Sequence, residues 1–70
     1  MGIWSKDYQS FLEKLRKARS AAGLTQVTAA RRLRKPQSYV SKCESGERRV
    51  DVVELKRLAK LYGKPLSFFS

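Results

Sequence analysis

The sequence predicts an all-α fold, a compact five-helix bundle, because three features of the chain agree. Apolar residues recur three and four positions apart, which is the spacing of one face of an α-helix. Glycine or proline interrupts this pattern at short intervals. No repeat, low-complexity tract or long linker separates the segments. We therefore expect a single domain over residues 1–70, with helices at about 5–22, 26–34, 37–45, 51–62 and 65–70.

The first two predicted helices have clear boundaries. Residues 5–22 carry one apolar stripe, and Gly23 is suited to end that helix. Thr25 can cap the N-terminus of the second helix. The inner face of this second helix is expected to carry Val27, Ala30 and Leu33.

The third predicted helix, residues 37–45, has an unusual outer face. Pro36 stops the second helix and suits the start of the third, and Gly46 follows its last residue. At about 100° per residue, four side chains of this helix point to its inner side, namely Tyr39, Val40, Cys43 and Glu44. The acid Glu44 therefore lies among three less polar residues. The outer face lacks solvating Glu/Lys pairs and instead carries small hydrogen-bonding groups, namely Gln37, Ser38, Ser41, Lys42 and Ser45.

The last two predicted helices follow a capping signal. Asp51 and Glu54 have the spacing of a capping box at the start of the fourth helix, and Gly63 ends it. Beyond Pro65, a short fifth helix is expected to contain Leu66, Phe68 and Phe69. Two roles are open for the phenylalanine pair, which either closes the core or contributes to a dimer surface.

Composition narrows the function to binding. Seventy residues are too few to surround a wide catalytic cleft and keep a core, and the net charge of +10 favours an anionic polymer or an anionic membrane surface. Histidine is absent and Cys43 is the sole cysteine, so we expect no enzyme activity, metal site, cofactor or internal disulfide. No apolar run approaches the ~18 residues of a membrane span, and no signal peptide is apparent, so a cytoplasmic protein is expected.

Residues 26–34 and 37–45 have the spacing of a helix-turn-helix. In that motif the first helix crosses the DNA backbone and the second enters the major groove. Glutamine suits adenine, lysine suits guanine and serine suits either base, so the outer face of residues 37–45 has the chemistry that base edges require. The predicted base-reading residues are Gln37, Ser38, Ser41 and Lys42, and an ordinary solvated helix face is the alternative.

Three segments, LRKARSAAGLTQ, PQSYVSKCESGERR and DVVELKRLAKLYG, resemble in order those of the Cro and phage-repressor type of helix-turn-helix regulators, the Xre family, whose fold is lambda-repressor-like. The resemblance covers roughly residues 12–69. It implies that Gln26 grips a phosphate and braces the helix at 37–45, and that residues 46–49 lie along the DNA backbone. It also implies an ion pair between Arg19 and Glu44, which accounts for the inward acid. The chain departs from the family pattern at three positions, Ala29, Arg34 and Cys43.

Further backbone contacts are expected around the reading helix. Arg48 and Arg49 follow it directly, and Lys35 precedes it. For Tyr39, packing and a hydroxyl-to-phosphate bond are both open. Long-range attraction is the expected role of Arg31 and Arg32.

We therefore expect a sequence-specific regulator of double-stranded DNA, of bacterial or phage type and repressor-like, that binds as a homodimer, with the fourth and fifth helices as the family-like interface. One rival is a protein-interaction module of the same fold, antitoxin-like or coactivator-like, with DNA binding secondary. A second rival, a cationic membrane-surface peptide, would need one long amphipathic helix, whereas glycine and proline break this chain repeatedly.

Overall fold

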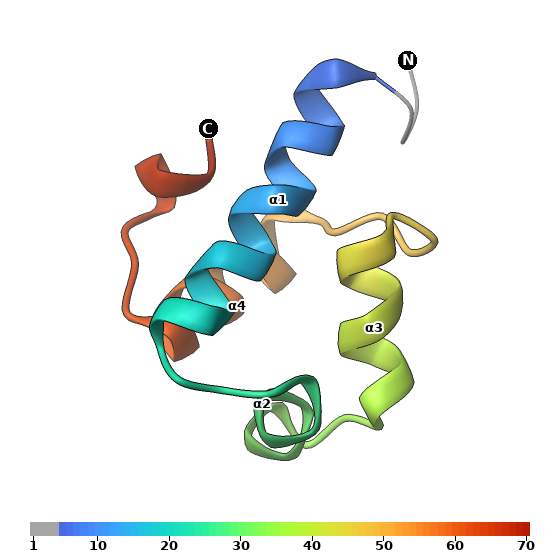
Figure 1. Cartoon of the computed structure of the whole chain (residues 1–70), viewed down its shortest axis with the longest axis vertical. Helices are drawn as coiled ribbons and strands as arrows, with labels where there is room; N and C mark the ends of the chain where they lie inside the picture. The colour runs from blue at the N-terminus through green and yellow to red at the C-terminus, as the bar shows by residue number, and fades with distance from the viewer. Residues whose placement is uncertain (1–4) are drawn as a thin grey trace.

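The computed structural model describes residues 5–70 and shows four α-helices followed by a 3-10 helix, with no strand in that range (Figure 1). The elements are α1 (Lys6–Ala21), α2 (Gln26–Leu33), α3 (Gln37–Ser45), α4 (Val52–Tyr62) and η1 (Leu66–Phe69). The all-helical class is confirmed. None of these helices combines the length and the apolar character that a membrane crossing requires.

The prediction of a fifth α-helix at residues 65–70 is wrong. Residues 66–69 instead form a 3-10 helix, in which the Phe68 N–H donates to the Pro65 carbonyl over 3.0 Å. Pro65 precedes this turn and provides no side-chain cap. A segment of four residues is too short to offset the cost of nucleating an α-helix, so the tighter turn forms instead.

Side-chain caps define where three helices begin. The Ser5 hydroxyl accepts from the Tyr8 N–H at the start of α1, and the Thr25 hydroxyl accepts from the Thr28 N–H at the start of α2, each over 3.1 Å. Asp51 and Glu54 form a capping box at the start of α4. These caps satisfy N–H groups that would otherwise lack a partner in the first turn.

The helices enclose one apolar core, which is formed by Leu12, Leu15, Ala18, Ala29, Ala30, Val40, Leu58, Ala59, Tyr62 and Phe69. Phe69 is 4% exposed and its ring lies edge-on to those of Phe11 and Phe68. Of the two roles considered for the phenylalanine pair, Phe69 therefore closes the core. Ala30 is buried, as predicted for the inner face of α2, but the placement of Val27 on that face is wrong, because Val27 is 45% exposed and Ala29 is buried instead.

The packing holds α3 at one side of the molecule. In Figure 1, α3 and η1 lie on opposite sides of α1. α3 packs against α1 and α2, whereas α4 packs against α1, α2 and η1. The N-terminus of α3 follows the turn from α2, and its C-terminus leads into the loop to α4. The outer face of α3 is exposed to solvent.

Candidate nucleic-acid interface

The outer face of α3 presents the polar strip that the sequence predicts. Its four members are all exposed, and they are Gln37, Ser38, Ser41 and Lys42. The opposite face is closed by Val40, Cys43 and Glu44, all of which are buried. Burial also raises the pKa of the Cys43 thiol, so this side chain behaves as a small core residue.

A tight turn at residues 34–36 joins α2 to α3. Arg34 adopts the left-handed conformation, with φ 59° and ψ 43°. Its N–H donates to the Arg31 carbonyl over 3.1 Å, and the Lys35 N–H donates to the Ala30 carbonyl over 2.9 Å. These two bonds are typical of the turn that ends a helix at a left-handed residue. Arginine therefore makes a left-handed turn of the kind for which glycine is the usual residue.

Glu44 anchors the inner side of α3. The Arg19 guanidinium donates from Nε to one carboxylate oxygen over 2.6 Å and from Nη2 to the other over 3.1 Å. The Gln26 amide donates to the second oxygen over 3.0 Å. Glu44 is only 4% exposed, and its hydrogen bond to Arg19 raises the pKa of that guanidinium. The three residues tie α1, α2 and α3 together.

Gln26 thus has a structural contact beside the phosphate contact expected of it. Its amide nitrogen carries two hydrogens, and one is directed at Glu44. The contact of its second hydrogen with a phosphate stays a prediction.

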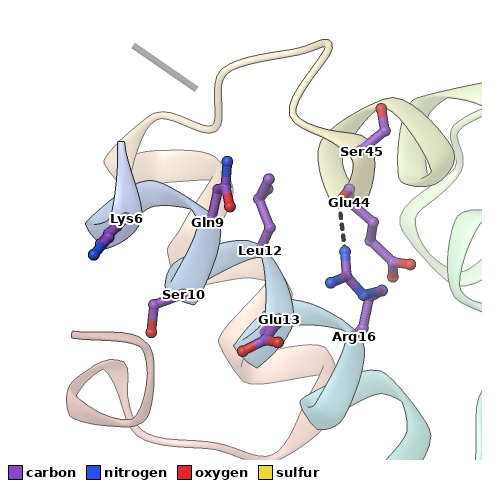
Figure 2. A pocket seen from close by; sticks show the side chains of 8 residues that line it. All are labelled: Lys6, Gln9, Ser10, Leu12, Glu13, Arg16, Glu44 and Ser45. Carbon is purple, nitrogen blue, oxygen red and sulfur yellow. Dashed lines mark hydrogen bonds between the residues drawn. The ribbon is translucent and has the colours of Figure 1, made fainter. Parts of the chain in front are cut away.

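Arg16 is an anchor of α3 that sequence reasoning missed. Its Nη1 donates to the backbone carbonyl of Glu44 over 2.9 Å, as Figure 2 shows. It lies beside a polar groove of about 490 Å³ between α1 and the end of α3, which is also lined by Lys6, Gln9, Ser10, Leu12, Glu13 and Ser45. The signal in the sequence was its spacing of three from Arg19, which places both arginines on one side of α1.

A second cluster holds the other side of α3. The Tyr39 hydroxyl donates to Glu54 Oε2 over 3.0 Å, and the Arg48 guanidinium donates to the same oxygen from Nε over 3.2 Å and also from Nη2. Lys35 Nζ and Arg48 Cζ lie 5.3 Å and 5.1 Å from the centre of the Tyr39 ring. Two of the predicted backbone-contacting residues, Tyr39 and Arg48, thus bind one acid, Glu54, which the sequence predicted only as a cap, and Lys35 lies over the Tyr39 ring.

The electrostatics of this second cluster fix its protonation. The pKa of Tyr39 is raised to about 12, mainly because burial removes water from the phenol and also because its hydroxyl is hydrogen-bonded to Glu54. The hydrogen bond from Arg48 lowers the pKa of Glu54. At neutral pH the tyrosine therefore donates and the carboxylate accepts. Glu44 and Glu54 are thus each compensated by an arginine.

Arg49 turns toward α1 rather than toward this cluster. Its guanidinium carbon lies 4.8 Å from the centre of the Tyr8 ring, and the Tyr8 hydroxyl accepts from the Val50 N–H over 3.1 Å. Arg49 is exposed and has no acidic partner among the ion pairs of the described residues. Its charge is therefore available on the surface beside α3.

Comparison with known protein families identifies the arrangement of α2 and α3. Residues 10–66 match the model of the helix-turn-helix domain. The chain belongs to this helix-turn-helix family. Membership indicates a DNA-binding regulator, in agreement with the exposed polar strip on the second helix of the motif. No curated protein matches the sequence. Residues 5–70 of this helix-turn-helix protein hold no group of three His, Cys, Asp or Glu residues able to bind a metal ion.

Proposed function

We propose that the protein is a sequence-specific regulator, of the Cro and phage-repressor type, that docks α3 in the major groove of double-stranded DNA. The observation that carries this proposal is the exposed strip Gln37, Ser38, Ser41 and Lys42 on a helix whose other side is fixed by Glu44. Base readout needs such hydrogen-bonding groups on a rigid element that fits the groove. The strip and the fixed helix are therefore both needed for this role.

The DNA backbone is bound from both ends of the strip. Gln26 lies at the start of α2 and Lys35 in the turn before α3, whereas Arg48 and Arg49 follow α3. Lys35 and Arg48 both lie close to the Tyr39 ring. A phosphate approaching this edge would share Arg48 with Glu54, and it would bind the Tyr39 hydroxyl only by taking its single hydrogen from Glu54. Such contacts hold the register of the protein on the duplex but do not select the sequence.

The biological action follows from occupying an operator. A 70-residue chain with four base-reading side chains discriminates weakly, so we propose that two copies bind two half-sites about one helical turn, ~34 Å, apart. Repression by blocking the promoter is the simplest result of such occupancy in a bacterial or phage-infected cytoplasm. We propose no enzymatic role, since the sequence lacks histidine, the commonest general base.

Selection of duplexes from a random pool, followed by footprinting of the winner, tests this proposal. We expect enrichment of a two-fold symmetric site. If roughly four to six phosphates are neutralised per subunit, log affinity falls with log salt at a slope near −0.9 for each contact. Failure to enrich any duplex over scrambled competitor would refute DNA readout and favour the protein-interaction module of the same fold.

Two variants separate base readout from backbone binding. Lys42→Ala should relax the preference at one base position and cost about 1–3 kcal/mol on the selected site only. Arg49→Ala should weaken all duplexes alike and flatten the salt slope by about one unit. Lys17→Ala, which removes an exposed cation from α1, is the matched control. A Lys42→Ala protein that loses affinity equally for all sequences would contradict the base-reading role.

A further inference from the structure

The loop after α3 folds back on the last turn of the helix. The Ser45 hydroxyl donates to the Lys42 carbonyl over 3.3 Å, and the Arg48 N–H donates to the same carbonyl over 3.1 Å. The Glu47 N–H donates to the Ser45 hydroxyl over 3.3 Å. Gly46 permits this reversal with a φ of 87°. The backbone of Glu47 is therefore held beside the end of the polar strip.

The fold-back places the Glu47 carboxylate next to the predicted base reader Lys42. Glu47 Oε2 lies 3.9 Å from Lys42 Nζ, and the two side chains are 68% and 52% exposed. A pair this exposed is screened by water, so the attraction between the two side chains is weak. DNA can therefore displace Glu47 from Lys42 at little cost.

Glu47 differs in this respect from the other two carboxylates around α3. Glu44 is buried against Arg19, and the Glu54 side chain is 13% exposed and held by Arg48 and Tyr39. The charge of Glu44 is therefore balanced by Arg19, and that of Glu54 by Arg48. Glu47 is left as an exposed negative charge on a surface proposed to face phosphates, with a single lysine partner.

We infer that Glu47 is a specificity-determining residue that keeps Lys42 from binding phosphates indiscriminately. This inference rests on the proposed function. On an arbitrary duplex, Lys42 could add one more phosphate contact. Glu47 competes with that phosphate for the ammonium group of Lys42. On the selected site the O6 and N7 atoms of a guanine take over the ammonium group, so Glu47 is displaced in exchange for a base contact. Glu47 thus lowers non-specific affinity more than specific affinity.

The variant Glu47→Gln tests this role with little change of shape. One additional phosphate contact at about 0.1 M salt strengthens binding to random duplex about three- to tenfold and steepens the salt slope by about 0.9. Affinity for the selected duplex should rise less, so the ratio of the two affinities falls. Glu13→Gln changes the net charge equally but lies on α1, and it should leave that ratio unchanged.

A double variant tests whether the effect passes through Lys42. In a Lys42→Ala background, Glu47→Gln should no longer steepen the salt slope, because the lysine that would gain the phosphate is absent. A slope that steepens equally in both backgrounds would overturn the inference and leave only general repulsion by Glu47. The unfolding midpoint of each variant, measured by circular dichroism, verifies that the fold is retained.

The remaining outcomes separate this inference from the proposed function. If the wild-type protein selects a site but Glu47→Gln binds random duplex with unchanged affinity and slope, only the inference fails. If Glu47→Gln selects a different base at one position, Glu47 is itself a base reader, in the manner of a carboxylate that accepts from cytosine N4, and the inference is also overturned. If the wild-type protein enriches no duplex, the proposed function and the inference fail together.

Discussion

Arg34 is the residue at which the backbone carries most strain. It has a positive φ of 59°, and it is the one non-glycine residue in 5–70 that does so. The left-handed conformation costs an ordinary L-residue about 1–2 kcal/mol, whereas glycine adopts it freely but loses more entropy on folding. We predict that Arg34→Gly raises the free energy of unfolding by about 0.5–1 kcal/mol. Urea unfolding measures this difference.

Arg34→Ala is the control for this prediction. It removes the charge of Arg34 but keeps the steric cost of the left-handed turn. We expect no gain in stability from alanine. An equal gain from both substitutions would show that relief of charge repulsion with neighbouring cations, rather than backbone strain, is responsible.

Glu44 is the residue whose loss should cost most. Its carboxylate is nearly inaccessible and accepts three hydrogen bonds from Arg19 and Gln26. Removing one partner of a buried ion pair leaves the other charge uncompensated, which typically costs about 3–5 kcal/mol. Because the Arg19 side chain retains 17% exposure, we predict a loss of about 3 kcal/mol for Glu44→Ala, measured by urea unfolding.

Arg19→Lys separates geometry from charge at the same site. Lysine keeps the positive charge but cannot donate to both carboxylate oxygens with one planar fork. A smaller loss of stability than in Glu44→Ala is therefore expected. An unaltered unfolding midpoint for Glu44→Ala would contradict a clamping role for the pair.

At the scale of the elements, local signals were predictable and contacts between elements were not. The caps at Thr25 and Asp51 depend on residues three apart, so the sequence contains them in full. The bonds from Tyr39 and Arg48 to Glu54 depend on how α4 lies against the loop after α3, and no local pattern encodes that. The pairing of Arg19 with Glu44 was expected only through the resemblance to a family.

In a short element, the spacing of apolar residues does not define a unique buried face. α2 has only eight residues, so the buried arc could be drawn through Val27 as easily as through Ala29. Ala29 lies in the core and is 0% exposed, whereas Val27 is 45% exposed. The same shortness turned the predicted last helix into the 3-10 helix η1.

The link between α3 and α4 should respond to acid. Arg48 holds the pKa of Glu54 below its ordinary value of 4.5. A carboxyl with a lowered pKa stabilises the fold above that ordinary value, and the contribution disappears as the pH falls through the lowered pKa. We predict that Glu54→Gln costs about 1–2 kcal/mol at pH 7, as expected for loss of a charge-assisted hydrogen bond, and much less once the pH falls below the lowered pKa of Glu54.

Urea midpoints of the wild-type and Glu54→Gln proteins across this pH range measure the effect. The two curves should converge in acid, because protonated glutamate and glutamine both present a neutral group to Arg48. Parallel curves would show that Glu54 titrates with the same pKa in the folded and unfolded states.

For the whole molecule, charge and exposed apolar area act against each other in the proposed dimer. Val53 is 55% exposed on α4 and Leu66 is 42% exposed on η1, which makes them candidates for burial in a contact through these elements. The exposed residues of α4 also include three cations, Lys56, Arg57 and Lys60. Two copies joined through this region bring like charges together, so free protein should associate weakly at low salt.

We predict that self-association of the free protein tightens as KCl rises from about 50 to 300 mM, because salt screens the repulsion between the cations of α4.

Leu66→Ser should weaken the dimer roughly tenfold, since it removes apolar area from both copies. Val27→Ser is the matched control, as Val27 is 45% exposed but lies on α2. Sedimentation equilibrium measures both effects. Equal weakening by the two substitutions would show that the interface does not include η1. Association that weakens as salt rises would show that ion pairs rather than apolar contacts join the copies.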